Sequence, residues 1–229
     1  FMAPITAIEY APDGNTIAVG MKNGVARMLD LTTGKKRPKL IGHKTGQAVT
    51  SMFYLPDSRT LTTGSLDGTI RFWDVVTCAE YFKFEKEVGP ITALSLSSDG
   101  RTLAIGLADD TVRIWNSTTG DENLRLTGYP NPIAAMDVSP NGNWFAAGMK
   151  EEGTDYLVIA ETKRAGHYSK INVDGVPVQA VAYDPTGSIL ATSSADQKIR
   201  FWSTKTNEIE VEWQGPPYKI ESLHFSPDG

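Results

Sequence analysis

Residues 42–74 read GHKTGQAVTSMFYLPDSRTLTTGSLDGTIRFWD. Short runs rich in apolar and β-branched residues are separated here by polar, turn-forming residues, such as Pro56-Asp57-Ser58 and Asp67-Gly68. Runs of this kind are typical of β-strands, and Pro, Asp, Ser and Gly are the residues that tight turns favour. The stretch therefore predicts several short strands joined by turns.

The first of these turns belongs to a repeat that covers the whole chain. Relatives of Pro56-Asp57-Ser58 recur at intervals of 44, 42, 42, 45 and 42 residues, and the six copies begin at Pro12, Pro56, Ser98, Pro140, Pro185 and Pro227. Seven, four and two residues before each copy stands an apolar residue: Ile5/Ile8/Tyr10, Val49/Met52/Tyr54, Ile91/Leu94/Leu96, Ile133/Met136/Val138, Val178/Val181/Tyr183 and Ile220/Leu223/Phe225. Such self-similarity at a fixed period is the signature of a repeat architecture.

Further positions after each turn also repeat from unit to unit, and we call each set of equivalent positions a column. Eight positions after the first five copies stands a small residue (Gly20, Gly64, Gly106, Gly148 and Ser193), and fifteen positions after four of them an arginine (Arg27, Arg71, Arg113 and Arg200). Two positions later come Leu29, Trp73, Trp115 and Trp202. A later turn position holds Gly34, Cys78, Gly120 or Asn207, mostly residues that tolerate positive φ.

Each unit predicts four strands, which in the third unit span 91–97, 102–106, 111–115 and 123–127. No stretch shows helical apolar periodicity with caps, so the chain is predicted to be all-β. A four-stranded unit cannot bury both of its faces alone, and radial stacking of such units gives a propeller. The fourth unit carries about three extra residues around 151–155, which predict a solvated loop and an irregular blade.

The stretch 42–74 resembles a complete tryptophan–aspartate (WD) repeat, and weaker copies cover essentially the whole chain. The resemblance implies a WD-repeat β-propeller with blades near 1–42, 43–85, 86–127, 128–172 and 173–214, and with 215–229 as the first strand of a sixth. Members commonly have seven blades, so residues 1–229 are expected to form a single, incomplete propeller that is part of a seven-bladed ring. A closed ring of five or six blades, or closure by another chain, are the alternatives.

The resemblance also implies a structural tetrad, in which four side chains of one blade are joined by hydrogen bonds. In the second unit it falls on His43, Thr63, Asp67 and Trp73. The other units keep only parts of it. Asp109 and Trp115 remain in the third, with Ile105 and Glu85 in the other slots, and the fifth keeps Thr192, Asp196 and Trp202, with Asn172 in the histidine slot.

Composition excludes several classes of protein. The 229 residues carry a net charge of −5, which argues against a generally basic nucleic-acid binder. One cysteine and three histidines leave neither an internal disulfide nor a structural zinc cluster. No apolar run approaches the ~20 residues of a membrane span, and no signal peptide opens the chain. A cytoplasmic protein is expected, or a nuclear one if the basic cluster 35–39 is functional rather than a means of discouraging edge pairing.

The expected function is a non-catalytic protein–protein interaction scaffold, a subunit of a protein complex without cofactor or metal. Partners are expected on the rim formed by the blade-to-blade loops and the turns between second and third strands, where prolines hold aromatic residues in place. Candidate contacts are Tyr129, Asn131, Tyr218, Lys219, Lys44, Gln47, Lys86, Glu87, Lys22 and Lys150. The alternatives are a propeller that binds or turns over a small molecule at its central channel mouth, and a nucleic-acid-associated subunit.

Overall fold

A computed structural model of the chain describes residues 3–85, 89–127, 135–151, 153–164, 167–173, 176–226 and 229; it does not describe the side chains of 150 and 151. The described residues form β-strands, turns and bends, and none of them lies in a helix. The chain divides into two compact units, Phe1–Leu94 and Ser95–Gly229, with the boundary inside strand β9. The prediction of an all-β chain is therefore confirmed.

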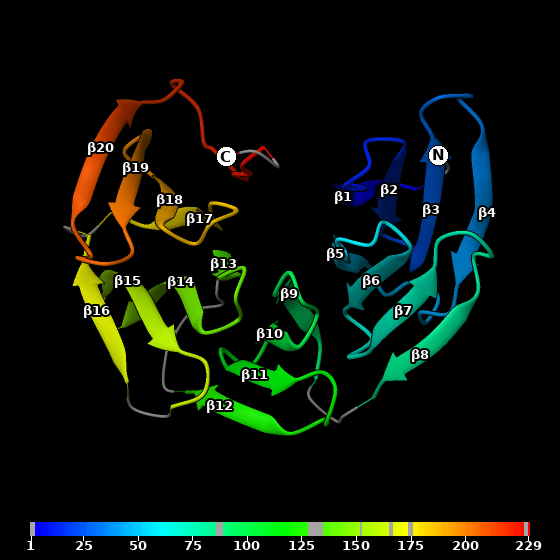
Figure 1. Cartoon of the computed structure of the whole chain (residues 1–229), viewed down its shortest axis with the longest axis horizontal. Coiled ribbons are helices and arrows are strands. Elements are labelled where there is room, and N and C mark those ends of the chain that lie inside the picture. Colours follow the sequence, from blue (N-terminus) through cyan, green and yellow to red (C-terminus); the bar gives the residue numbers. More distant parts are fainter. Residues whose placement is uncertain are drawn as a thin grey trace. The chain divides into compact units, whose positions relative to one another are not determined.

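The strands form five four-stranded sheets, each built from four consecutive strands in sequence order (Figure 1). The first sheet holds β1 (Ile5–Tyr10), β2 (Thr16–Met21), β3 (Val25–Asp30) and β4 (Lys36–Ile41). The second holds β5 (Val49–Tyr54), β6 (Thr60–Ser65), β7 (Ile70–Asp74) and β8 (Glu80–Phe84). The third holds β9 (Ile91–Leu96), β10 (Thr102–Leu107), β11 (Val112–Asn116) and β12 (Glu122–Leu126), within one or two residues of the predicted spans.

The fourth and fifth sheets complete the series. The fourth holds β13 (Ala135–Val138), β14 (Trp144–Glu151), β15 (Thr154–Glu161) and β16 (Tyr168–Asn172). The fifth holds β17 (Val178–Tyr183), β18 (Ile189–Ser194), β19 (Lys198–Ser203) and β20 (Ile209–Gln214).

The predicted irregularity of the fourth unit is wrong. Its extra residues lengthen the central hairpin, because β14 and β15 have eight residues each and stay paired as far as Glu151 opposite Thr154. Asp155, predicted in a solvated loop, lies in β15 and is buried. Lengthening two paired strands together keeps their backbone hydrogen bonds satisfied, which a loop of the same length would not do.

Turn geometry explains one of the sequence columns. The residue that precedes the outer strand has a positive φ in the first, second, third and fifth sheets: 68° at Gly34, 59° at Cys78, 75° at Gly120 and 60° at Asn207. This left-handed conformation costs glycine nothing and strains most other residues. The Cys78 side chain is half-buried at this turn.

Close packing between consecutive sheets explains the column of small residues. Within the first unit, a Cβ added to Gly20 would lie 2.7 Å from Cγ1 of Val49 on β5. Within the second unit, a Cβ added to Gly148 would lie 2.7 Å from Cβ of Val178 on β17. A side chain at either position would therefore push the next inner strand away.

The cores lie where these sheets meet. In the first unit, Ala18, Ala26, Met28 and Leu40 of the first sheet form one cluster with Val49, Met52, Tyr54, Leu61 and Trp73 of the second. In the second unit, Ala146, Leu157 and Ile159 of the fourth sheet cluster with Val178, Val181, Tyr183, Leu190 and Trp202 of the fifth. The first and fourth sheets thus present small and aliphatic residues to the apolar columns and tryptophan of the sheet that follows each of them.

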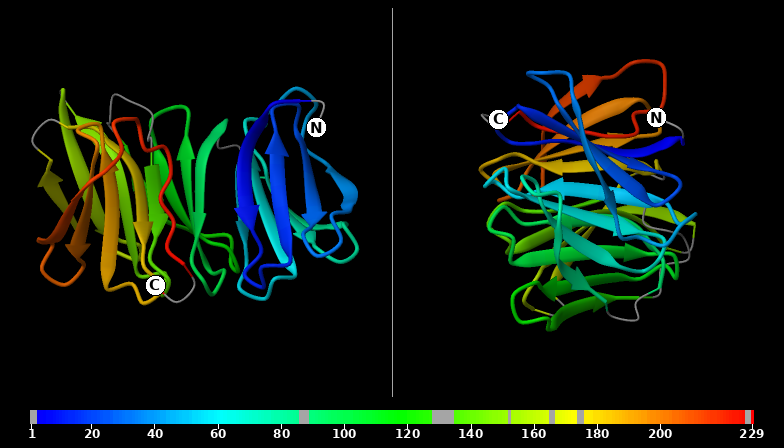
Figure 2. Two further views of the ribbon diagram at one scale, coloured as in Figure 1. Left: turned by 90° about the horizontal axis from the view of Figure 1, so that it is seen from above. Right: turned by 90° about the vertical axis from the view of Figure 1, so that its right-hand side faces the viewer.

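The predicted inner strand at 217–229 is not found among its described residues, 217–226 and 229, none of which lies in a strand. The segment still lies against the fifth sheet (Figure 2), because Ser193 Oγ donates to the Ile220 carbonyl at 3.2 Å and Phe225 stands edge-on to Phe201 at 6.3 Å. Ile220 therefore packs on the fifth sheet in the way that Val49 packs on the first sheet and Val178 packs on the fourth. A strand needs a hydrogen-bonded neighbour, and none of the described strands pairs with this segment.

Candidate functional site

Four side chains of the second sheet and the loop before it form one hydrogen-bonded network. The indole Nε1 of Trp73 donates to Thr63 Oγ1 at 2.9 Å, and Thr63 Oγ1 lies 2.7 Å from Nε2 of His43. Nδ1 of His43 lies 3.1 Å from Asp67 Oδ2 and 3.1 Å from Thr69 Oγ1. The structure thus brings together the four residues that the sequence placed in the tetrad.

The chemistry of the donors fixes the protons of this network. An indole nitrogen can only donate, so Thr63 Oγ1 accepts from Trp73, and an ionised carboxylate can only accept, so Nδ1 of His43 carries a proton and donates it to Asp67. In a neutral imidazole Nε2 is then an acceptor, and Thr63 donates its hydroxyl hydrogen to it. When His43 is neutral and in this tautomer, every polar group of the network has a hydrogen-bond partner.

Burial supports the neutral form. His43 is 6% exposed, and burial lowers the pKa of its imidazole below the ordinary value, an effect that the nearby Asp67 carboxylate only partly offsets. Burial acts to raise the pKa of Asp67, but hydrogen bonds from the Lys44 backbone and from Thr69 outweigh it and keep that pKa low. Asp67 is therefore ionised and His43 neutral at pH 7, and because Thr63 and Trp73 are also buried, this hydrogen-bonded network lies inside the fold.

The third sheet has lost most of the equivalent network. Ile105, fully buried, stands in the threonine slot and has no polar side-chain atom to offer. Asp109 accepts hydrogen bonds from the backbone and hydroxyl of Thr111 in its own turn, and Glu85 in the histidine slot is exposed. Trp115 remains buried.

The fifth sheet keeps half of the network. Trp202 Nε1 donates to Thr192 Oγ1 at 2.9 Å, as in the second sheet. Asp196, however, accepts from Arg200 Nη2 at 2.5 Å, and Asn172 in the histidine slot is exposed. Because asparagine is too short to bridge a buried threonine and aspartate, the carboxylate pairs with the arginine instead.

The predicted contacts of the first unit lie on touching segments. Lys22 is exposed in the turn between β2 and β3, and this turn contacts the loop 42–48 through a hydrogen bond from Gly46 N to Asn23 O at 3.1 Å. Lys44 is exposed on that loop, and its backbone N–H donates to Asp67 Oδ2 at 2.8 Å. Gln47 is half-buried. The His43 network thus anchors the loop that carries Lys44.

Close approach again explains a glycine at this surface. Gly24 has a φ of 85°, and a Cβ added there would lie 2.7 Å from the Lys44 carbonyl oxygen. A larger residue would separate the turn from the loop. The two segments are therefore held together by backbone contact.

A similar contact occurs in the second unit. Gly215 N donates to Gln197 O at 2.7 Å, which joins the turn between β18 and β19 to the segment that carries Tyr218 and Lys219. Tyr218 is 75% exposed, and Lys219 lies 3.5 Å from Glu221. Tyr129, Asn131, Lys86 and Glu87 lie outside the described residues, as does the side chain of Lys150, whose backbone is part of β14.

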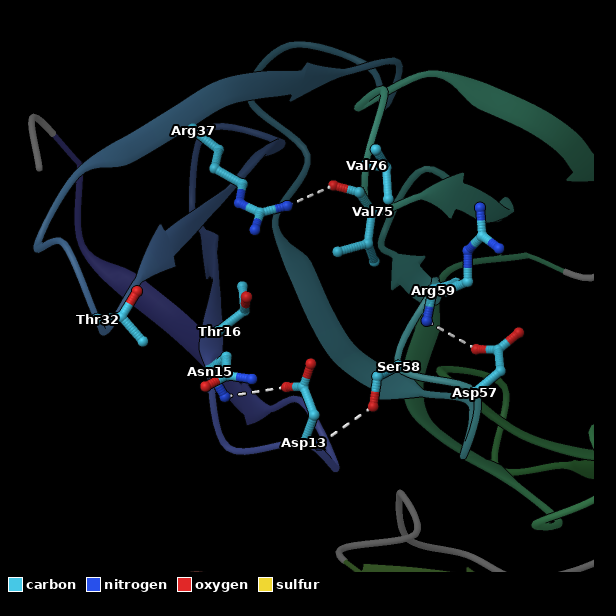
Figure 3. A pocket seen from close by; sticks show the side chains of 10 residues that line it. All are labelled: Asp13, Asn15, Thr16, Thr32, Arg37, Asp57, Ser58, Arg59, Val75 and Val76. Carbon is cyan, nitrogen blue, oxygen red and sulfur yellow. Dashed lines mark hydrogen bonds between the residues drawn. The ribbon is translucent and has the colours of Figure 1, made fainter.

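A pocket of about 520 Å³ in the first unit was not predicted from the sequence (Figure 3). Figure 3 shows that hydrogen bonds of the fold occupy much of its lining: Arg37 Nη1 donates to the Val75 carbonyl at 2.9 Å, and the Asp13 backbone N–H donates to Ser58 Oγ at 3.1 Å. The lining residues come mainly from turns, not from the starts of inner strands: Asp13, Asn15, Thr16, Thr32, Arg37, Asp57, Ser58, Arg59, Val75 and Val76. Among the described residues, none acts as a base on Ser58 Oγ, so the pocket offers binding groups without a nucleophile–base pair.

A second feature missed by the sequence reasoning is Asp137 on β13. Its Oδ1 accepts from Ser95 Oγ at 2.7 Å, and its Oδ2 accepts from the Tyr183 backbone N–H at 2.8 Å. The carboxylate thereby links three inner strands of the second unit. The sequence signal for Asp137 was a charged residue between two apolar columns, but no motif includes this position.

Cys78 and the basic cluster 35–39, which the sequence also singled out, lie in surroundings that belong to the fold. Burial raises the pKa of the Cys78 thiol, which makes it a poor nucleophile. In the cluster 35–39, Arg37 contacts Val75 and lies 3.8 Å from Asp30, and the cluster leads into the outer strand β4 as predicted.

Within the described ranges there is no group of three or more His, Cys, Asp or Glu side chains placed to hold a metal ion. Nor do these ranges contain a helix of the length and hydrophobicity that crossing a membrane requires.

Comparison with known proteins adds the family. The sequence model described as "WD domain, G-beta repeat" matches residues 34–74, 81–116, 120–157 and 164–203, more than half of the chain. The first match begins just before β4 and ends with β7, so one sequence repeat joins the outer strand of one sheet to three strands of the next. The sequence repeat is therefore offset by one strand from the four-stranded sheet, and each repeat contributes to two consecutive sheets.

Short similarities to curated proteins were also found. Over 52 residues the chain is 40% identical to "Eukaryotic translation initiation factor 3 subunit I" of Pyricularia oryzae and of Aspergillus terreus, and 38% identical to that of Neurospora crassa. Each match covers 23% of this chain and 15% of the relative. Each of the four matched units runs from one four-stranded sheet into the next, so together they reach all five sheets. The chain belongs to the WD-repeat family.

Proposed function

We propose that the chain is a non-catalytic scaffold of a cytoplasmic multi-subunit complex, and that it binds partner proteins through the rim formed by the loops between sheets and the turns between second and third strands. Membership of the WD-repeat family and the relatives named as subunits of a translation initiation factor support this proposal. We further propose that the five sheets are blades of one incomplete propeller. The equivalent places of Val49, Val178 and Ile220 support that reading.

One observation carries the choice of surface. The turn at Asn23 and the loop at Gly46 are hydrogen-bonded to each other, so exposed Lys22 and Lys44 belong to one surface although 22 positions separate them in sequence. In the second unit, the bond between Gly215 and Gln197 does the same for the exposed Tyr218. Exposed tyrosines supply large contact areas in interfaces, and rim charges guide association and selectivity.

Site-specific photocross-linking in cells tests this proposal. A photoreactive amino acid placed at position 22, 44 or 218 should cross-link to a defined partner protein. The same amino acid at Lys205, exposed in the turn before β20, should not. Substitution at these exposed positions should leave the melting temperature unchanged within about 1 °C. Equal cross-linking at position 205, or none at all three rim positions, would reject the rim as the binding surface.

A further inference from the structure

The pocket of about 520 Å³ in the first unit lies at the strand ends opposite to the rim proposed above. Its lining comes mainly from the turns that join first to second strands and third to fourth strands in the first two sheets. In an antiparallel sheet these two turns share one end, and the turn between the second and third strands lies at the other. The volume is within the range of about 300–1,000 Å³ that is typical of small-molecule sites. The pocket is therefore a candidate ligand site separate from the rim.

The matching space between the third and fourth sheets is closed by direct contact. Thr102 Oγ1 donates to the Gly142 carbonyl at 3.2 Å, and a Cβ added to Gly142 would lie 2.6 Å from that hydroxyl oxygen. The repeat sets Thr16 in the place of Thr102 and Ser58 in the place of Gly142. A serine cannot approach as closely as glycine, and Ser58 Oγ instead accepts from the Asp13 backbone N–H at 3.1 Å. This difference in sequence, between two adjacent sheets of one unit, keeps the pocket open.

Two polar groups of the first sheet lack the partners that the second sheet provides. In the second sheet, Thr60 Oγ1 donates to Asp57 Oδ2 at 3.2 Å, and Asp57 Oδ1 accepts from two backbone N–H groups. The equivalent Asp13 accepts only from the Asn15 N–H, through Oδ1, among the described residues. Thr16 lines the pocket and is 3% exposed, yet its hydroxyl forms no hydrogen bond within the described ranges. A carboxylate oxygen and a hydroxyl are thus left for a ligand.

Arg37 supplies a positive charge to the same pocket. Figure 3 shows its guanidinium and the Asp13 carboxylate on opposite sides of the space. Arg37 Nη1 donates to the Val75 carbonyl at 2.9 Å, which fixes the guanidinium, and Nη2 lies 3.8 Å from Asp30, beyond hydrogen-bond distance. No ion pair joins Arg37 to Asp13, both of which the structure describes. The two opposite charges therefore face the pocket without neutralising each other.

The remaining charged residues of the lining keep this balance. Asp57 and Arg59 add one charge of each sign, so the ten lining residues include two aspartates and two arginines. A ligand with only negative charge would be repelled by Asp13, and a ligand with only positive charge would be repelled by Arg37. A ligand that carries both charges gains a charge-assisted hydrogen bond at each side.

We infer that this pocket binds a small zwitterion, an α-amino acid with an aliphatic side chain. The ammonium group pairs with Asp13 Oδ2. The carboxylate pairs with Arg37 and accepts a hydrogen bond from the Thr16 hydroxyl. The aliphatic side chain lies against Val75 and Val76, of which Val76 is 65% exposed when the pocket is empty.

The test compares L-leucine with two analogues that each lack one charge. These are 4-methylpentanoate, which is leucine without its ammonium group, and 3-methylbutylamine, which is leucine without its carboxylate. Each is titrated into the full 229-residue chain labelled with ¹⁵N, and the amide resonances are followed by NMR. L-leucine should cause saturable shifts at Asp13, Thr16 and Ser58, and it should bind about tenfold more tightly than either analogue.

Asp13→Asn should weaken L-leucine binding about tenfold and remove the preference over 4-methylpentanoate, because it deletes only the negative charge. The turn accepts this change, since Asn141 holds the same position in the fourth sheet and accepts from the Asn143 N–H at 3.0 Å. Thr16→Val is a second variant, which removes the unpaired hydroxyl and should weaken binding about threefold.

Asp99→Asn is the matched control. It makes the same change at the same turn position of the third sheet, in the other unit, and should leave L-leucine binding unchanged. Equal affinity for L-leucine and either analogue would overturn the inference, as would equal effects of Asp13→Asn and Asp99→Asn. Absence of saturable shifts up to about 50 mM L-leucine would overturn it as well.

Discussion

The first and second sheets carry the same rows of residues in opposite situations. Tyr54 is buried beneath the first sheet, whereas Tyr10 in the same column is 60% exposed. Arg71 pairs with Glu80, whereas Arg27 lies opposite Lys39. The backbone pattern is the same, so the columns specify the four-stranded sheet in both cases. What differs is the cover over the face and the charge on the outer strand, and these differences separate residues buried between two sheets from residues exposed on one.

The largest difference between the two sheets is expected at the tryptophan column. Trp73→Ala should destabilise the chain by about 3–5 kcal/mol, because it removes a fully buried aromatic side chain and its hydrogen bond to Thr63. Leu29→Ala in the same column of the first sheet should cost about 1 kcal/mol, since Leu29 is only half-buried. Urea denaturation of both variants measures the comparison, and equal losses would break it.

A smaller effect is expected from the threonine that joins the network. Thr63→Val removes the partner of both Trp73 Nε1 and His43 Nε2, and each buried polar group left unpaired costs about 1–3 kcal/mol. Thr192→Val in the fifth sheet leaves only Trp202 Nε1 unpaired and should cost roughly half as much. Thermal unfolding of the two variants compares them. A larger loss from Thr192→Val would show that the second sheet does not depend on its fuller network.

Acid should weaken the second sheet in two steps. The folded pKa of His43 is lowered, so the stability it contributes is complete above its unfolded value near 6.5 and is lost as pH falls toward the folded value. The pKa of Asp67 is also lowered, so its contribution is lost below about pH 4. Both groups act in the same direction, and unfolding free energies measured from pH 8 to about pH 2 should fall with pH.

His43→Asn is the control for this pH dependence, because the fifth sheet has asparagine in the same slot. The variant should be less stable at pH 8 and should lack the step near pH 6.5. Persistence of that step in the variant would assign it to another group. Asp137 does not imitate it, since burial raises the pKa of that carboxyl and its contribution changes in the opposite direction.

Much of the fold could be predicted from the sequence because its determinants are local and repeated. Strand positions follow from the apolar columns, and the positive φ at Cys78 and Asn207 follows from glycines in the equivalent positions. The four tetrad members of the His43 network could be placed because the resemblance of 42–74 to a WD repeat implies them at these positions. The eight-residue strands of the fourth sheet could not, because three extra residues are compatible with either a loop or a longer hairpin.

The candidate surfaces were less predictable, because they depend on what lies next to each residue in space. The exposure of Tyr10 could not be read from a column in which every other tyrosine or leucine is buried. Nor could the unpaired charge of Arg27, which becomes evident only when register sets Lys36 in the place of Glu80. The pocket near Arg37 arises where turns of two sheets lie close together, and the repeat marks those turns without showing that they are neighbours in space.

The most direct test of this account makes the same substitution in one column of both sheets. Tyr54→Ser and Tyr10→Ser should be compared by their unfolding free energies in urea. The account predicts a loss of about 3–5 kcal/mol for Tyr54→Ser, from an emptied core site, and less than about 1 kcal/mol for Tyr10→Ser. Equal losses would contradict it, because they would show that Tyr10 contributes as much to the folded core as Tyr54 does.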